Sequence, residues 1–261
     1  MIIYELTKPG DRLSQSNDIS KNFELENLIR HLIDTFFEAN VALNLYLGEK
    51  QNSNLYFQRE RENRDSDLKL KSEIREKIEL EYPSGNNFEK FDEINYKAEI
   101  EFKKQIWNKG RVPSDLKNKL IFIHAKTFLY ALDNFEKQLK KLLKNQIIPE
   151  SCNSFYIKLI EHFPNLRELR NSTHHQEDRI RGERFGKKID LKPISNRLIH
   201  APKGGVLIMN SLNGDNYGGT LGDGTFGEVE VSIDSMNKLQ SILQEFINSL
   251  DWKGNKEHLP K

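Results

Sequence analysis

The sequence predicts a mainly α-helical protein with a small antiparallel β region near its C-terminus and a closing helix. Apolar residues repeat at helical spacing over most of residues 21–182. Glycine then becomes frequent, and valine and isoleucine alternate with polar residues, as they do in half-buried strands. A last amphipathic segment follows this alternation. These three observations define the fold class, and each predicted element is justified below.

The first part of the chain predicts three helices. The first covers residues 21–47, with Gly48 as its stop. A stretch of mixed charge leads into a second apolar repeat, which stops at Pro83-Ser84-Gly85. The third helix covers residues 87–108, because apolar side chains again recur every three or four positions.

The middle of the chain predicts the longest apolar stripe and the helices that follow it. Ser114 caps a helix that runs to about residue 145. A short helix over residues 151–162 comes next. Pro164 opens another helix, since proline is tolerated in the first turn, and we expect this helix to end near Gly182.

The glycine-rich region predicts a small antiparallel sheet. Alternation at residues 206–208 and 228–233 indicates strands, and glycine-rich turns separate them. Asp234 or Ser235 then begins the closing helix.

The predicted architecture is an antiparallel helical bundle followed by a β appendage. The bundle of five or six helices occupies residues 1–182, and the appendage with the closing helix occupies residues 183–261. No flexible linker separates the two parts, so we expect them to pack as one unit.

Composition limits the partners and the compartment. The net charge of +1 gives no global attraction to nucleic acid or membrane, so any nucleic-acid surface must come from local patches. A single cysteine, Cys152, excludes an internal disulfide and is typical of a reducing compartment. The chain shows no apolar run close to the roughly 18 residues of a membrane span and no signal peptide. We therefore expect a cytoplasmic protein with no membrane association.

Residues 169–179 concentrate the chemistry of the chain. They bring an arginine, an amide and two adjacent histidines into one predicted helix. Arginine stabilises phosphate charge, and histidine exchanges a proton near neutral pH. At about 100° per residue, Arg167, Arg170 and His174 share one face, whereas His175 points about 140° away from Arg170. His175 therefore needs a second chain, or a local distortion, to act with Arg170.

The motif Arg170-Asn171, three residues and His175 resembles the R-polar-x3-H motif of HEPN domains, helical bundles of prokaryotic toxin, defence and CRISPR-associated proteins. The resemblance covers residues 20–182 and leaves the β appendage outside the minimal family domain. It implies a metal-independent endoribonuclease that acts as a homodimer with facing motif helices. By this resemblance Arg170 binds the scissile phosphate, His175 is the general acid and base, and Asn171 orients His175.

This chemistry requires only proton transfer and charge stabilisation, because the 2′-hydroxyl of RNA supplies the nucleophile. We therefore expect RNA and a second copy of the chain as partners, and no cofactor. An antitoxin or another defence-system protein is a further candidate partner.

The alternative is a non-catalytic interaction or RNA-binding scaffold with a solvated helix face. In that case His174 and His175 bond Asp178 or Arg179 one turn away. A metal site is not expected here, because adjacent histidines point about 100° apart on a helix and chelate one ion poorly.

Four lysines share one face of the long helix at positions i, i+3, i+4 and i+7. They suit the tracking of an RNA backbone, and a solvated lysine face is the alternative. These residues are Lys137, Lys140, Lys141 and Lys144.

Residues 221–229, LGDGTFGEV, resemble the glycine-rich loop of protein kinases. No strand lysine, catalytic loop or metal-binding motif of a kinase follows. Asp223-Gly224 is a strong turn pair, so we predict a hairpin turn between two strands.

Overall fold

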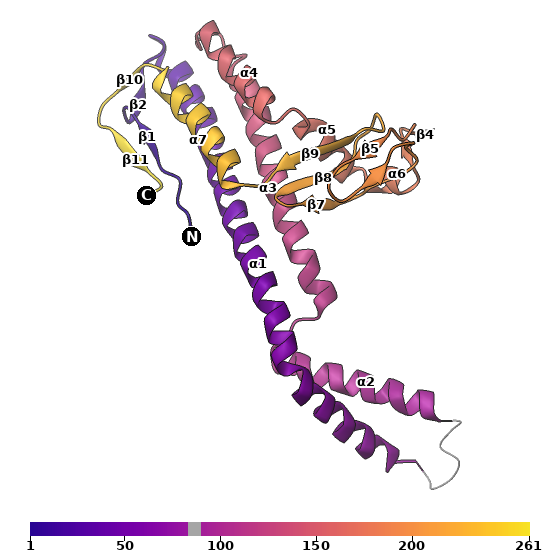
Figure 1. Ribbon diagram of the computed structural model, residues 1–261. Coiled ribbons are helices and arrows are strands. Elements are labelled where there is room, and N and C mark those ends of the chain that lie inside the picture. Colours follow the sequence, from indigo (N-terminus) through magenta and orange to yellow (C-terminus); the bar gives the residue numbers. More distant parts are fainter. Residues whose placement is uncertain (83–89) are drawn as a thin grey trace. The chain divides into compact units, whose positions relative to one another are not determined.

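The computed structural model describes residues 1–82 and 90–261, and it is mainly α-helical with small antiparallel sheets, as predicted (Figure 1). The chain divides into two compact units. One comprises Met1–Leu47 with Phe122–Lys261, and the other comprises Gly48–Ile121. The boundary expected between residues 182 and 183 lies inside the first of these units.

Helix α1 (Ile19–Glu79) continues through Gly48, so the predicted stop there is wrong. A single glycine costs only about 1 kcal/mol within a helix, which the flanking residues offset. Side-chain bonds one turn apart support the helix beyond it. Ser53 Oγ donates to the carbonyl of Glu49 at 3.0 Å, and Gln58 Nε2 donates to Glu62 Oε1 at 3.1 Å.

The second unit contains the later part of α1, helix α2 (Phe91–Asn108) and the start of α3 (Ser114–Leu142). Ile74 of α1 and Ile94 of α2 are buried there. Arg111 makes a two-pronged bond to Asp67, at 2.5 and 2.9 Å. The predicted stop at residues 83–85 and the first residues of the predicted helix 87–108 lie outside the described residues.

The core of the first unit lies among α1, α3, α4 (Asn153–His162) and α7 (Ile233–Asn248). The rings of Phe155 and Phe246 meet edge to face at 6.0 Å and join α4 to α7. The largest fully buried side chains of this core include Phe36, Phe128, Phe135 and Phe246.

Helix α7 begins at Ile233, one or two residues before the predicted start at Asp234 or Ser235. The hydroxyl of Ser232 accepts the backbone N–H of Ser235 at 3.1 Å, so Ser232 is the N-cap. The preceding η1 turn (Glu150–Cys152) and α4 together replace the single short helix expected over residues 151–162.

The two ends of the chain pair with each other (Figure 1). Strand β1 (Leu6–Lys8) is antiparallel to β11 (Glu257–Leu259), and β2 (Arg12–Leu13) is antiparallel to β10 (Trp252–Lys253). These ribbons close the first unit next to α1 and α7.

The larger sheet consists of antiparallel β7 (Ser211–Asn213), β8 (Asn216–Thr220) and β9 (Phe226–Glu230). The turn at Asp223-Gly224 joins β8 to β9, which confirms the predicted hairpin. Residues 206–208 are not a strand. The N–H of Ile208 donates to the hydroxyl of Thr220, and the carbonyl of Ile208 accepts the N–H of Thr220. These two bonds stand in place of a regular strand ladder.

Two short hairpins precede this sheet. They are β3 (Glu183–Arg184) with β4 (Lys187–Lys188), and β5 (Ile194–Ser195) with β6 (His200–Ala201). The helix that carries the motif, α5 (Leu166–His174), lies against β8 and β9. The β region therefore packs directly on the candidate site.

Candidate functional site

The motif helix is broken at the motif histidine. Helix α5 ends at His174, helix α6 (Gln176–Ile180) begins two residues later, and His175 lies between them with φ −100° and ψ 52°. The continuous helix predicted to Gly182 is therefore wrong. The break follows the turn that joins Arg170 to His175, so these two residues still lie about 140° apart around α5.

The break has a local cause. The hydroxyl of Thr173 donates to the carbonyls of Leu169 and Arg170, at 2.7 and 2.9 Å, and such bonds bend helices. Residues 171–175, NSTHH, are all weak helix formers. The N–H of His175 donates to the carbonyl of Asn171 at 3.0 Å, so the last turn of α5 is complete. The helix does not continue beyond it.

Arg170 is held by a buried carboxylate on α3. Its Nε lies 2.9 Å from Oδ2 of Asp133, whose side chain is 1% exposed. The N–H is not aimed along this line, so the contact is an ion pair rather than a hydrogen bond. Lys137 Nζ lies 2.5 Å from the same oxygen. Asp133 thus balances two cations and sets the position of the Arg170 guanidinium.

Part of Arg170 remains accessible. Its side chain is 18% exposed, and its two Nη groups make no hydrogen bond with residues 1–82 or 90–261. A phosphate oxygen can therefore bind at that end while Asp133 holds the other.

The two histidines are exposed side by side. The ring centroids of His174 and His175 are 5.2 Å apart with nearly perpendicular planes, and His175 Nδ1 lies 3.7 Å from Glu177 Oε1. Asp178 and Arg179, the partners expected for a solvated helix face, are engaged elsewhere. Both imidazoles are open to a substrate or a second chain.

Asn171 lies beside these histidines but does not orient His175 through its side chain. Only its carbonyl contacts His175, through the backbone bond described above. Its half-buried amide makes no hydrogen bond with the described part of the chain.

Arg179 joins the motif to the β region, a role that the sequence did not predict. Its side chain is buried, its Nε donates to Ser172 Oγ at 3.2 Å, and its Nη1 donates to the carbonyl of Glu183 at 2.7 Å. Burial, and secondarily the nearby Arg184, lowers the pKa of Arg179. No local pattern distinguishes this arginine from its exposed neighbours, because its partners come from two other elements, α5 and β3.

A second buried acid, which the sequence also did not predict, lies one turn after Asp133. Glu136 accepts the hydroxyl of Tyr156 at 2.8 Å, and burial followed by this bond raises the pKa of Tyr156. The exposed Arg167 lies close enough to oppose that rise. α3 and α4 thus place a polar network beside α5.

The four lysines do not form one uniform face. Lys137 pairs with Asp133, and the ammonium of Lys140 lies 5.4 Å from the centroid of the Tyr156 ring. Lys141 is exposed near the end of α3. Lys144 lies beyond α3, which ends at Leu142 rather than near residue 145, so its predicted place on the helix is wrong.

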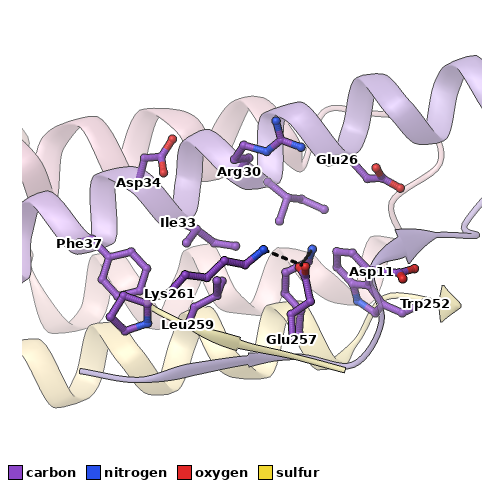
Figure 2. A pocket seen from close by; sticks show the side chains of 13 residues that line it. Asp11, Glu26, Arg30, Ile33, Asp34, Phe37, Trp252, Glu257, Leu259 and Lys261 are labelled. Carbon is purple, nitrogen blue, oxygen red and sulfur yellow. Dashed lines mark hydrogen bonds and ion pairs between the residues drawn. The ribbon is translucent and has the colours of Figure 1, made fainter. Parts of the chain in front are cut away.

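A separate cavity of about 460 Å³ lies between α1 and the terminal strands (Figure 2). Arg30, Phe37 and Trp252 border it, and Glu257 bridges Lys8 at 2.6 Å and Lys261 at 3.2 Å. It includes none of the motif residues.

Comparisons of the chain with known protein families, with characterised proteins and with solved structures find no match. In the described ranges, no three His, Cys, Asp or Glu side chains gather in a way that could hold a metal ion. Within those same ranges, no helix combines the length and apolar character needed to cross a bilayer.

Proposed function

We propose that this protein is a HEPN-like, metal-independent endoribonuclease that acts as a homodimer. The observation that carries the proposal is the exposed histidine pair at the end of the motif helix, on the same helix as an arginine held by the buried Asp133. Arg170 and His175 lie about 140° apart around this helix, so a second chain is needed to bring an imidazole to each arginine. A toxin or phage-defence setting follows from the resemblance and belongs to the same proposal.

The proposed reaction is attack of a ribose 2′-oxygen on its own 3′-phosphate. One imidazole takes the 2′-hydroxyl proton, the new oxygen–phosphorus bond forms, and the bond to the 5′-oxygen breaks. A protonated imidazole gives a proton to the leaving 5′-oxygen. The products are a 2′,3′-cyclic phosphate and a 5′-hydroxyl. Arg170 stabilises the negative charge that develops on the phosphorane.

The acid and the base come most simply from two facing copies of the chain. Both imidazoles are exposed in one chain, so another chain can approach them. A second motif helix would supply another His175 and exclude water from the phosphate, which strengthens the contribution of Arg170.

Cleavage of unstructured RNA in EDTA tests this function. Arg170→Ala and His175→Ala should each lower the rate at least about a hundredfold, as expected for loss of charge stabilisation or of a general acid–base group. His31→Ala, which removes an exposed histidine of α1, is the matched control. His174→Ala shows whether the neighbouring imidazole takes part.

The result that refutes the proposal is wild-type cleavage by both motif variants, or RNA that stays intact with the wild-type protein. Mixing wild-type protein with an excess of His175→Ala protein tests the dimer. If the acid and the base are the His175 residues of two chains, mixed dimers lack one of them, and the excess should suppress the wild-type activity. RNA binding without cleavage would favour the non-catalytic scaffold.

A further inference from the structure

The hairpin of β3 and β4 places an aromatic residue where the backbone disfavours it. Arg184 pairs with Lys187, so Phe185 and Gly186 form a two-residue turn with φ of 51° and 73°. Positive φ at both positions is the type I′ pattern, which favours Asn-Gly. A bulky side chain with positive φ is sterically strained. The turn therefore carries phenylalanine against its local preference.

The ring of Phe185 is not buried, so packing in a core does not offset this strain. Its residue is 81% exposed, and the guanidinium carbon of Arg184 lies 5.6 Å from the ring centroid. Strained backbone positions cluster at active sites, ligand clamps and switch regions. The side chain is thus available to an external ligand.

The surrounding sequence is a basic part of a nearly neutral chain. Residues 181–205 contain seven lysines and arginines and two acidic residues, a net charge of +5, whereas the whole chain carries +1. Lys187 makes no ion pair with the residues that the structure describes. Among the described residues, the ion pair of Arg184 is an exposed contact of 3.7 Å with Glu168. These cations favour an anionic partner.

The glycine-rich loop, residues 221–229, packs against the β3–β4 hairpin. A Cβ at Gly222 would lie 2.9 Å from the side chain of Arg184, so the guanidinium packs directly over this glycine. The carbonyl of Gly224 accepts the N–H of Lys192 at 3.0 Å. The loop that resembles a kinase motif thus shapes the base of this hairpin, in line with its predicted structural role.

The hairpin is also fastened to the motif helix. Arg179 bonds both Ser172 of α5 and the carbonyl of Glu183 in β3. Lys188 Nζ donates to the carbonyl of Arg181 at 2.9 Å. A strand of RNA held by the hairpin would therefore be held in a fixed relation to the motif.

We propose that the β3–β4 hairpin binds single-stranded RNA, with the ring of Phe185 stacked on an unpaired base and Arg184 and Lys187 on the phosphates. Stacking needs an exposed base face, which a duplex hides, and every base has one. A hollow beside the ring, lined by Phe185, Lys187 and Asp223 among others, leaves room next to it. The choice of RNA rests on the proposed function.

The decisive variant is Phe185→Asn. It removes the ring and completes the Asn-Gly turn, so the melting temperature should stay the same or rise. In a His175→Ala background, which leaves RNA intact, its Kd for a labelled, unstructured 12-nucleotide RNA should increase about tenfold. Phe185→Trp should retain binding. Lys187→Glu should weaken binding and reduce its salt dependence.

The inference is overturned if Phe185→Asn binds the single strand as tightly as its parent, or if an RNA duplex binds equally well and with the same dependence on Phe185. The outcome is separable from that of the proposed function. Phe185-dependent binding without any cleavage by the unaltered chain would support the hairpin and refute the nuclease. Motif-dependent cleavage with no effect of Phe185 on binding would support the nuclease and refute the role of the hairpin.

Discussion

Asp133 on α3 and Arg170 on α5 form an ion pair in which Oδ2 and Nε are 2.9 Å apart and the carboxylate is 1% exposed. The two residues lie on different helices, so their contact depends on how these helices pack. A buried carboxylate is stable only with cations close by, and Lys137 supplies the second one. This pair makes Asp133 a positioning residue for the arginine of the motif.

Asp133→Asn should both destabilise the protein and impair the site. We expect a loss of about 1–3 kcal/mol in the free energy of unfolding, because Arg170 and Lys137 lose their counter-charge. The cleavage rate at saturating RNA should fall, since the guanidinium is no longer held. Urea unfolding and kcat measure the two effects. Asp65→Asn, at an exposed carboxylate, is the control, and equal behaviour of the two variants would contradict the positioning role.

Arg179→Gln should loosen the connection between the motif helix and the β3–β4 hairpin. Ser172 and the carbonyl of Glu183 lose their shared donor, which should cost about 1–3 kcal/mol. Amide hydrogen exchange in β3 and β4 should become faster. Arg197→Gln alters an exposed arginine elsewhere in the β region and should leave exchange in β3 and β4 unchanged. Unaltered protection in Arg179→Gln would show that the hairpin is held by other contacts.

Gly224→Ala and Gly205→Ala separate backbone strain from crowding. Both glycines have positive φ, 86° and 82°, so alanine costs about 1 kcal/mol or more at either position. At Gly224 the new Cβ would also overlap the carbonyl oxygen of Asp190, whereas nothing lies within 4 Å at Gly205. Thermal or urea unfolding should find Gly224→Ala the less stable variant by a further 1–3 kcal/mol or so. Equal losses would mean that the loop moves without cost.

The pairing of the chain ends should weaken in acid. Hydrogen bonds from Lys8, and then from Lys261, lower the pKa of Glu257 below 4.5. A carboxylate whose pKa is lowered in the folded state stabilises the fold at pH values above its pKa in the unfolded chain. This stabilisation is lost as the pH falls through its pKa in the folded state.

Glu257→Gln tests this dependence. The variant should be less stable than wild type at pH 7 by about 1 kcal/mol or less, and the difference should shrink as the pH falls from 7 to 3. Urea unfolding at both pH values measures it. A difference that persists undiminished at pH 3 would assign the effect to packing rather than to charge.

The helical segments and the hairpin turn could be predicted from the sequence, because they follow from local residue patterns. The Asp223-Gly224 turn was predicted from two residues, and the motif from six. The stop at Gly48 was wrong, because one weak helix former cannot end a helix that its neighbours support. The strand at residues 206–208 was wrong, because apolar alternation indicates burial and does not show which partner supplies the hydrogen bonds.

The sequence by itself determined the mainly helical class, the position of Arg170, His174 and His175, and the basic character of residues 181–205. Only the tertiary structure decided that the motif helix breaks at His175, that Asp133 holds Arg170, and that Phe185 faces solvent from a strained turn. The physical reason is that periodicity reports which side of an element is buried. The partner of a charged side chain depends on which helices and strands pack together, and this packing brings together residues far apart in the chain.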